Sequence, residues 1–123
     1  MNNIQTLAVV GGRYFTDYNT VAKELAKYQF ASLVSGGATG VDTLAYKYAK
    51  IHSIPIQVFK PDWQKYGKAA GPLRNKQIIK NANHVLAFWD GLSRGTRSSI
   101  QIARANNVPL TIISIKKGLK DEN

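Results

Sequence analysis

The sequence predicts one α/β domain of Rossmann-like type, with a five-stranded parallel sheet and helices on both of its faces. Five short runs of almost continuously apolar residues alternate with segments whose apolar residues follow a helical period. Such runs are typical of parallel strands that are covered on both sides. They are residues 7–10, 33–34, 56–59, 85–89 and 110–115. We expect the domain over residues 1–116, and a flexible charged tail over residues 117–123.

Helices are predicted between these runs from the spacing of apolar side chains and from punctuating residues. Spacings of three and four residues mark a buried helix face in two segments, at Val21, Leu25 and Tyr28, and at Val41, Leu44, Ala45, Tyr48, Ala49 and His52. Pro72 is expected at the first position of a third helix, where its missing N–H is not needed. A fourth helix is expected to begin after the turn at residues 90–96.

Proline predicts the order of the strands. Pro55 and Pro109 stand at the starts of the third and fifth apolar runs, and proline, which lacks an N–H, is confined to strand starts, bulges and edges. The first and fourth runs contain neither proline nor charge, so they suit the centre of the sheet. Right-handed crossovers then give the order 3-2-1-4-5. This order reverses between the first and fourth strands, and ligands of open α/β sheets bind at such a point, outside the carboxyl ends of the strands.

The charge balance indicates an anionic partner. There are 17 Lys and Arg against 7 Asp and Glu, a net charge of +10, which attracts a polyanion or a phosphate, although a basic protein can also simply be soluble. With no cysteine, and with His52 and His84 expected to be structural, we expect no disulfide, metal or cofactor. No segment has the length of a membrane span or the pattern of a secretion signal, so a cytoplasmic protein without membrane contact is expected.

Glycines gather at one rim of the predicted sheet. Nine of the ten follow strands, whereas the connections on the opposite rim use asparagine and proline. Glycine lets backbone N–H groups approach a ligand closely, and helix N-termini add positive potential, which together suit a phosphate. Tight turns that need glycine are the alternative explanation for this pattern.

Four acidic residues, Asp17, Asp42, Asp62 and Asp90, lie at the same rim. Asp17 is expected to cap the first helix, and Thr39 with Asp42 has the spacing of a capping box. Asp90 directly follows a central strand at the point where the strand order reverses. It is therefore expected to accept a hydrogen bond from a ribose hydroxyl.

The connection over residues 60–71 is long for a strand-to-helix loop, and it carries Trp63 and Tyr66 among lysines. Aromatic side chains in such a setting can stack on a base while the lysines meet phosphate. The alternative is that Trp63 pins the loop to the sheet.

Four ordered motifs resemble the small YspA-like branch of the SLOG superfamily. They are residues 11–17, residues 35–42, Asp62 with Trp63, and residues 67–75, and the resemblance covers nearly the whole chain. It implies a Rossmann-like fold, a ligand at the glycine-rich rim and, by analogy within the superfamily, a homodimer. The superfamily joins the LOG phosphoribohydrolases, which release bases from nucleoside monophosphates, with the DprA proteins, which bind single-stranded DNA.

The turn at residues 90–96 looks like a degenerate form of the phosphate loop of the LOG hydrolases, with Gly95 and Thr96 matching its end. Where those enzymes carry a catalytic glutamate this chain has Ser99, whereas Arg74 is similar to their catalytic arginine. A serine cannot supply the negative charge that stabilises a cation-like sugar or activates water when an N-glycosidic bond breaks. The resemblance therefore implies phosphate binding without efficient hydrolysis.

We expect a nucleotide or nucleotide-derived ligand in the crevice between the first and fourth strands. The expected ligand-binding residues are Gly11, Gly12, Arg13, Ser35, Gly36, Gly37, Asp42, Trp63, Arg74, Asn75, Asp90, Gly91, Ser93, Arg94, Gly95 and Thr96. The three arginines and Thr96 would hold phosphate through charge-assisted hydrogen bonds. Two alternatives remain: a nucleoside-phosphate N-glycosidase that uses Arg74 with Asp42 or Asp90, and a protein that binds single-stranded nucleic acid through its basic face.

Overall fold

The protein folds around one parallel sheet. A computed structural model describes residues 3–116, and its five strands have the order β3-β2-β1-β4-β5. They are β1 (Asn3–Gly11), β2 (Gln29–Ser35), β3 (Ile56–Val58), β4 (His84–Trp89) and β5 (Leu110–Ser114), and all neighbours are parallel. The predicted fold class and strand order are confirmed. The tail expected over residues 117–123 lies outside the described residues.

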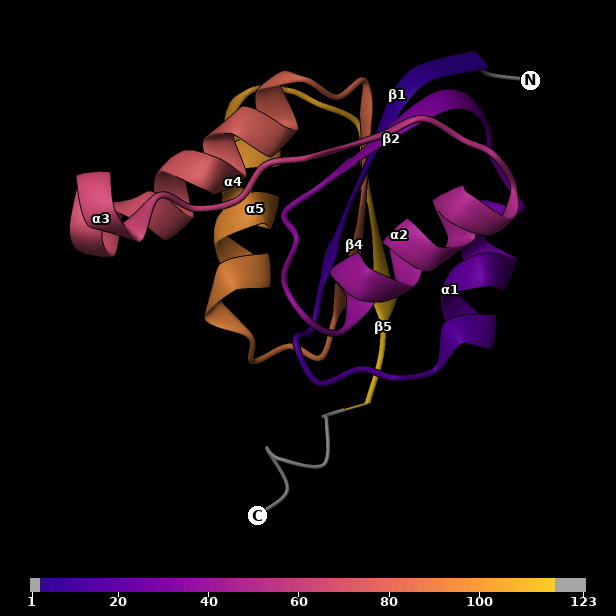
Figure 1. Cartoon of the computed structure of the whole chain (residues 1–123), viewed down its shortest axis with the longest axis horizontal. Helices are drawn as coiled ribbons and strands as arrows, with labels where there is room; N and C mark the ends of the chain where they lie inside the picture. Colours follow the sequence, from indigo (N-terminus) through magenta and orange to yellow (C-terminus); the bar gives the residue numbers. More distant parts are fainter. Residues whose placement is uncertain (1–2, 117–123) are drawn as a thin grey trace.

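Helices cover both faces of the sheet, which Figure 1 shows nearly edge-on. Helices α1 (Tyr18–Leu25) and α2 (Val41–Ile51) lie on one face, and α4 (Ala70–Lys80) and α5 (Arg94–Ala105) lie on the other. Between β3 and α4 the chain forms the short helix α3 (Trp63–Tyr66) and the 3-10 turn η1 (Gly67–Ala69). Within residues 3–116, no helix is long and apolar enough to cross a membrane.

Strand β1 shows why the central strands are almost continuously apolar. Successive side chains of a strand point to opposite faces. Leu7 and Val9 therefore pack into the core beneath α1 and α2, while Ala8 and Val10 pack into the core beneath α4 and α5. Because both faces are covered, no position along the middle of the strand can be polar.

The two prolines that predicted the sheet edges stand directly before the edge strands. The carbonyl of Pro55 accepts a hydrogen bond from the Leu33 N–H at 2.9 Å, and the carbonyl of Pro109 accepts one from the Val85 N–H at 2.8 Å. A proline carbonyl can join a parallel ladder although its nitrogen cannot donate. The proline before each edge strand therefore accepts a hydrogen bond from the neighbouring inner strand and needs no N–H of its own.

The start of α2 differs from the prediction. Helix α2 has Gly40 as its N-cap, with no side-chain capping bond, so the capping box expected at Thr39 and Asp42 is wrong. The Thr39 hydroxyl donates instead to the Arg13 carbonyl at 3.0 Å, and a carboxylate oxygen of Asp42 accepts from the Ala38 N–H at 3.1 Å. Thr39 therefore joins this loop to the segment after β1, and Asp42 holds the loop that precedes its own helix. The cap expected of Asp17 on α1 is confirmed, since its carboxylate accepts from the Thr20 N–H at 3.3 Å.

The connection over residues 60–71, expected as a loop, is mostly helical. Asp62 caps α3 by accepting from the Lys65 N–H at 3.0 Å, and η1 then leads directly into α4. As a result α4 begins at Ala70 and Pro72 is its third residue, not its first. Proline is tolerated there because the first-turn N–H groups of a helix have no partner within the helix.

Candidate functional site

A cavity of about 550 Å³ opens at the carboxyl ends of β1 and β4, where the strand order reverses. Its walls come from the segment that follows β1, from α4, and from the turn between β4 and α5. The volume is in the range of pockets that hold small molecules and cofactors. The cavity thus lies where the order of the strands predicted a ligand.

Most of the residues expected to bind ligand line this cavity. Those that do are Gly11, Gly12, Arg13, Asp42, Arg74, Asn75, Asp90, Ser93, Arg94, Gly95 and Thr96. Those absent from its lining are Ser35, Gly36, Gly37, Trp63 and Gly91. The lining also includes residues that the sequence did not single out for the site, among them Tyr14, Phe15, Ala38, Ile78, Leu92, Ile115 and Lys116. Tyr14, Phe15, Ala38 and Leu92 lie in segments that the sequence had placed at this rim, whereas Ile78 on α4 and Ile115 and Lys116 after β5 reach the cavity through the packing of the chain.

The turn between β4 and α5 presents the start of a helix to the cavity. One Asp90 carboxylate oxygen accepts from the N–H groups of Leu92 and Ser93, both at 2.8 Å, and so folds the turn. Ser93 is the N-cap of α5 but makes no side-chain capping bond, because its hydroxyl pairs with that of Thr96 at 3.1 Å. The first turn of α5 contains no acidic residue. Uncapped N–H groups and the helix dipole together make this end of α5 suited to an anion.

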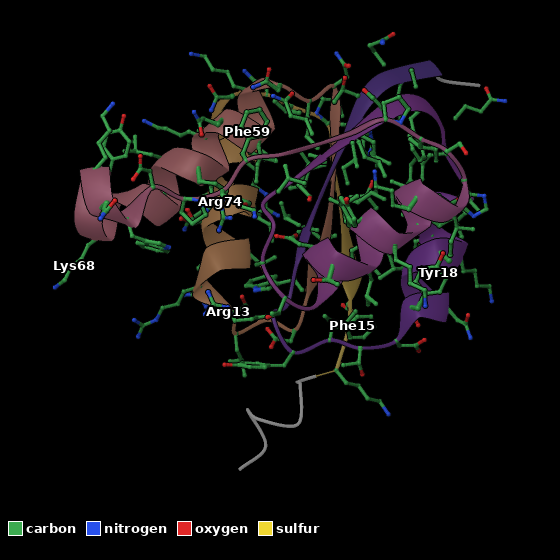
Figure 2. The ribbon with its side chains drawn as sticks, viewed as in Figure 1. Arg13, Phe15, Tyr18, Phe59, Lys68 and Arg74 are labelled. Carbon is green, nitrogen blue, oxygen red and sulfur yellow. The ribbon has the colours of Figure 1, made fainter. Side chains whose placement is uncertain are left out.

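Arg74 is held in place by backbone and by its neighbour on α4. Its Nη1 donates to the Gly36 carbonyl, and its Nε donates to the Asn75 side-chain oxygen at 3.0 Å. Figure 2 shows this side chain lying on the inner side of α4. Burial lowers the pKa of the guanidinium, while the nearby Asp42 carboxylate acts in the opposite direction. Two protein acceptors thus fix the plane of the guanidinium at the cavity wall.

Asp42 places a buried carboxyl in the same cavity. The residue is 7% exposed, and its burial raises the pKa of the carboxyl to about 6. The Ala38 N–H and the charges of Arg74 and Arg13 oppose this rise. A carboxyl with a pKa near 6 changes its charge close to physiological pH, so Asp42 can accept or donate a proton there.

The glycines of the rim fall into two groups with different reasons for lacking a side chain. A methyl group on Gly36 would collide with the Arg74 guanidinium, one on Gly11 with Val41, and one on Gly40 with the backbone of residues 12 and 13. By contrast, an added methyl on Gly91 or Gly95 would meet no atom within 4 Å. The idea that every glycine bares backbone to a ligand is therefore wrong for the first group, whose members let the protein pack on itself.

Ser99 occupies the position where the resemblance to the LOG hydrolases leads one to expect a carboxylate. It lies on α5, is 2% exposed and lines the cavity. The position is therefore well placed to face a ligand, but it offers a hydroxyl. Ser35, another expected contact, is also buried; its hydroxyl has no hydrogen-bond partner among the described residues, and it does not line the cavity.

Trp63 lies outside the cavity and does not pin its segment to the sheet. No residue of α3 is buried, and α3 packs against η1 and α4. The Trp63 ring lies beside Gly71 at the start of α4, where an added methyl would sit 3.5 Å from the ring. Its side chain is 58% exposed, so the residue is available at the surface.

The two histidines have structural surroundings. His84 is within hydrogen-bond distance of the Thr111 hydroxyl, at 3.0 Å, and its ring lies 5.5 Å from that of Tyr28. The His52 ring lies 4.2 Å from that of Tyr48 on α2. Among residues 3–116, no cluster of three His, Cys, Asp or Glu side chains is arranged to hold a metal ion.

Solved structures of two DNA processing A proteins share this fold. That of Streptococcus pneumoniae superposes with a TM-score of 0.74 at 22% identity, over 95% of this chain and 53% of its own. That of Helicobacter pylori, studied for its single-stranded DNA binding mode, gives a TM-score of 0.70 at 23% identity, over 96% of this chain and 70% of its own. This chain therefore spans about half of the first protein and about two thirds of the second. At these identities the likeness concerns the fold alone.

Sequence comparison identifies closer relatives. The Gene 61 protein of Mycobacterium phage D29 is 30% identical over 118 residues, which are 87% of this chain and 94% of the phage protein. The model of the YspA, cpYpsA-related SLOG family matches residues 6–66, which run from within β1 to the end of α3. This chain therefore belongs to the YspA, cpYpsA-related SLOG family.

Proposed function

We propose that the cavity binds the phosphate of a nucleotide or nucleotide-derived ligand, and that the protein acts by binding rather than by turnover. One observation carries the proposal: the uncapped start of α5 and the side chains of Arg13, Arg74 and Arg94 line one cavity at the strand-order reversal. Helix N–H groups and guanidinium groups are complementary to phosphate oxygens, and arginine can bind them in a bidentate way.

The ligand is expected to lie with its phosphate at α5 and its sugar toward the carboxyl groups. Gly95 leaves the wall at the start of α5 open, and Thr96 adds a hydroxyl there. Asp90 and Asp42 line the same cavity, and carboxylates accept hydrogen bonds from sugar hydroxyls. The cavity volume of about 550 Å³ is sufficient for a mononucleotide.

Hydrolysis of the ligand is a second candidate, and the position of Asp42 is the observation that favours it. A buried carboxyl with a pKa raised to about 6 is suited to protonate a leaving base. Ser99 argues against this function, because α5 then lacks the second carboxylate that the chemistry of an N-glycosidic bond requires. We therefore expect the wild type to release base from nucleoside monophosphates only at the background rate. The Ser99→Ala variant should show the same background rate.

Binding of single-stranded nucleic acid is the other alternative, since a structural neighbour was studied for its single-stranded DNA binding mode. The net charge of +10 is compatible with it. For the cavity, ligand class together with the effect of Arg94→Ala separates the two functions. A pocket that holds one nucleotide binds small molecules, whereas a basic surface binds oligonucleotides with an affinity that falls steeply with salt.

The test is a thermal-shift screen of the whole chain with nucleoside mono-, di- and triphosphates, dinucleotides and inorganic phosphate. A ligand at about 100 times its Kd adds about 2.7 kcal/mol to the free energy of unfolding, so Tm rises by several degrees. We expect Arg94→Ala to abolish the shift. The matched control is Arg104→Ala, which removes an exposed arginine from the last turn of the same helix and should leave the shift intact.

Two results would contradict the proposal. One is the absence of any shift with the whole panel, and the other is an equal loss in the Arg94 and Arg104 variants. A chromatographic assay of base release, run in parallel, decides the hydrolytic alternative. If the wild type releases base at about 1 per second or faster and Asp42→Asn abolishes the activity, the protein is an N-glycosidase.

A further inference from the structure

Residues 60–69, here called the α3 arm, form the least buried ordered segment of the domain. The arm runs from the end of β3 through α3 and η1, and nine of its residues are exposed while the tenth, Pro61, is half-buried. Figure 1 shows α3 at the outer end of the molecule, beyond α4. Burial in the hydrophobic core therefore does not explain why the arm is folded.

Local hydrogen bonds order the arm in place of burial. Asp62 caps the start of α3, and Gly67, at a φ of +53°, ends it by donating its N–H to the Trp63 carbonyl. Glycine readily adopts this left-handed backbone conformation, which other residues rarely do. The arm is thus a fixed platform whose side chains face water.

The arm exposes two aromatic rings. Trp63 is 58% exposed and Tyr66 is 45% exposed, and the Lys65 ammonium lies 5.2 Å from the Tyr66 ring centroid. Neither ring belongs to the cavity. Large apolar side chains that are gathered in one exposed segment are typical of a surface that meets a partner.

The charge of the arm selects the kind of partner. The arm contains three lysines, Lys60, Lys65 and Lys68, and a single carboxylate, that of Asp62. This carboxylate already accepts a hydrogen bond from the Lys65 backbone N–H. Among the described residues, none of these three ammonium groups has a carboxylate within 4 Å. Two copies of the arm would repel each other, and a chain with 7 acidic residues against 17 basic ones offers it little complementary surface. The partner is therefore anionic rather than a second copy.

We propose that the α3 arm binds single-stranded nucleic acid, with Trp63 and Tyr66 stacking on bases and the arm lysines meeting phosphates. Stacking needs bases that are not already paired in a duplex, and base faces of any sequence fit an aromatic ring. The arm is separate from the cavity: Figure 2 shows Lys68 pointing outward, away from Arg13 and Arg74. This surface would act independently of whichever nucleotide the cavity holds.

The chain contains a matched control for the arm. On α2, Tyr46 is 43% exposed and its ring centroid lies 5.1 Å from the Lys50 ammonium, almost the geometry of the Tyr66 and Lys65 pair. Figure 1 shows α2 across the sheet from α3. Removing either pair takes away one exposed ring and one charge. A difference between the two double variants therefore reports position rather than composition.

The experiment measures binding of a fluorescein-labelled 20-nucleotide oligo-dT by anisotropy, with the full chain at 50 and 200 mM salt. We expect Trp63→Ala to weaken binding about tenfold or more and Trp63→Phe to weaken it less, because a phenyl ring still stacks. The double variant at Tyr66 and Lys65 should lose affinity, while the one at Tyr46 and Lys50 should not. Quenching of tryptophan fluorescence by unlabelled oligo-dT should be lost in Trp63→Phe, which retains Trp89.

Several outcomes would overturn the proposal. They are no binding of oligo-dT at 50 mM salt, equal losses in the two double variants, or loss with Arg94→Ala while the arm variants bind normally. Sedimentation analysis covers the remaining explanation. If the wild type is a dimer that Trp63→Ala converts to a monomer, the arm is a contact between copies, and a nucleic-acid role for it is wrong. Unchanged Tm values show that each variant is folded.

Discussion

The turn between β2 and α2 (residues 36–40) and the α5 turn (residues 90–96, of which 94–96 are the first residues of α5) look alike in sequence and differ in the structure. Each leads from an inner strand to a helix, and each contains glycines. In the first turn the space beside each glycine is filled by protein, such as the Arg74 guanidinium at Gly36. In the second, Gly91 and Gly95 have open space. The glycines of the first turn are thus needed for close approach within the protein, whereas those of the second leave open space.

The same contrast holds for the acidic residues of the two turns. Asp42 is buried in the first turn of α2, where burial raises the pKa of its carboxyl. Asp90 lies before α5, and its carboxylate shapes the turn by accepting from two backbone N–H groups. The first turn of α5 itself contains no acidic residue. Asp42 is thus part of the packed interior, whereas the start of α5 carries no acidic residue and no side-chain cap.

The largest expected effect separates Gly40 from Gly95. Gly40 has a φ of +78°, and an added methyl would overlap the Gly12 carbonyl, so we expect Gly40→Ala to lower the free energy of unfolding by about 3 to 5 kcal/mol. Gly95→Ala should change it by less than about 1 kcal/mol, since alanine favours a helix. Urea denaturation measures both. Similar losses in the two variants would show that the turns do not differ as described.

An intermediate effect is expected from the pH dependence of stability at Asp42. Because its pKa is raised from 3.8 to about 6, the folded protein keeps a proton that the unfolded chain has already lost. The contribution of this group is therefore fully present below pH 4 and is lost as pH rises to about 6, by up to about 3 kcal/mol. Asp42→Asn should remove this slope.

Asp17 supplies the control for that measurement. Its hydrogen bonds to Thr20 lower its pKa, so its contribution is present above pH 4 and is lost as pH falls. Asp17→Asn should therefore change the pH dependence in the opposite direction. If unfolding curves at several pH values give the same slope for Asp42→Asn and the wild type, Asp42 is not buried as the structure has it.

The smallest of the three effects concerns affinity rather than folding. For a nucleotide that stabilises the wild type, Arg74→Ala should reduce the free energy of binding by about 1.5 to 3 kcal/mol, the scale of a charged hydrogen bond. The fold should stay intact. Isothermal titration calorimetry measures the loss. Lys76→Ala removes an exposed charge from the same helix and is the matched control. Unchanged affinity in a folded Arg74→Ala protein would remove this residue from the site.

Local signals in the sequence were enough to predict the sheet and the place of the cavity. An apolar run indicates that both faces of a strand are buried, because successive side chains point to opposite faces. Pro55 and Pro109 indicate edge strands, because proline has no N–H to donate. The partners of Gly36 and the burial of Asp42 could not be predicted, since they arise when α4 and the loops meet in three dimensions. Ile78 and Ile115 reach the cavity for the same reason.

The arm was predicted in composition but not in form. Its aromatic residues and lysines were noticeable in the sequence, whereas α3 itself depends on local bonds, among them those that the Lys65 N–H donates to the Asp62 carboxylate and the Gly67 N–H donates to the Trp63 carbonyl. A segment of mixed polarity without apolar period gives no helical signal. Exposure of Trp63 also arises because no element within residues 3–116 covers it, which no local pattern reports.

The open space beside Gly91 and Gly95 has a consequence for how this family can diversify. A side chain at Gly95 would meet no atom within 4 Å of its first carbon, so a substitution there can alter the cavity wall without disturbing the packing of the domain, whereas Gly91, at a φ of +86°, would strain the backbone of any other residue. Substitutions in the α2 turn have no such freedom. Variation in ligand preference among descendants of one ancestral protein would therefore accumulate on one side of the cavity, while the other side preserves the architecture that all of them inherit.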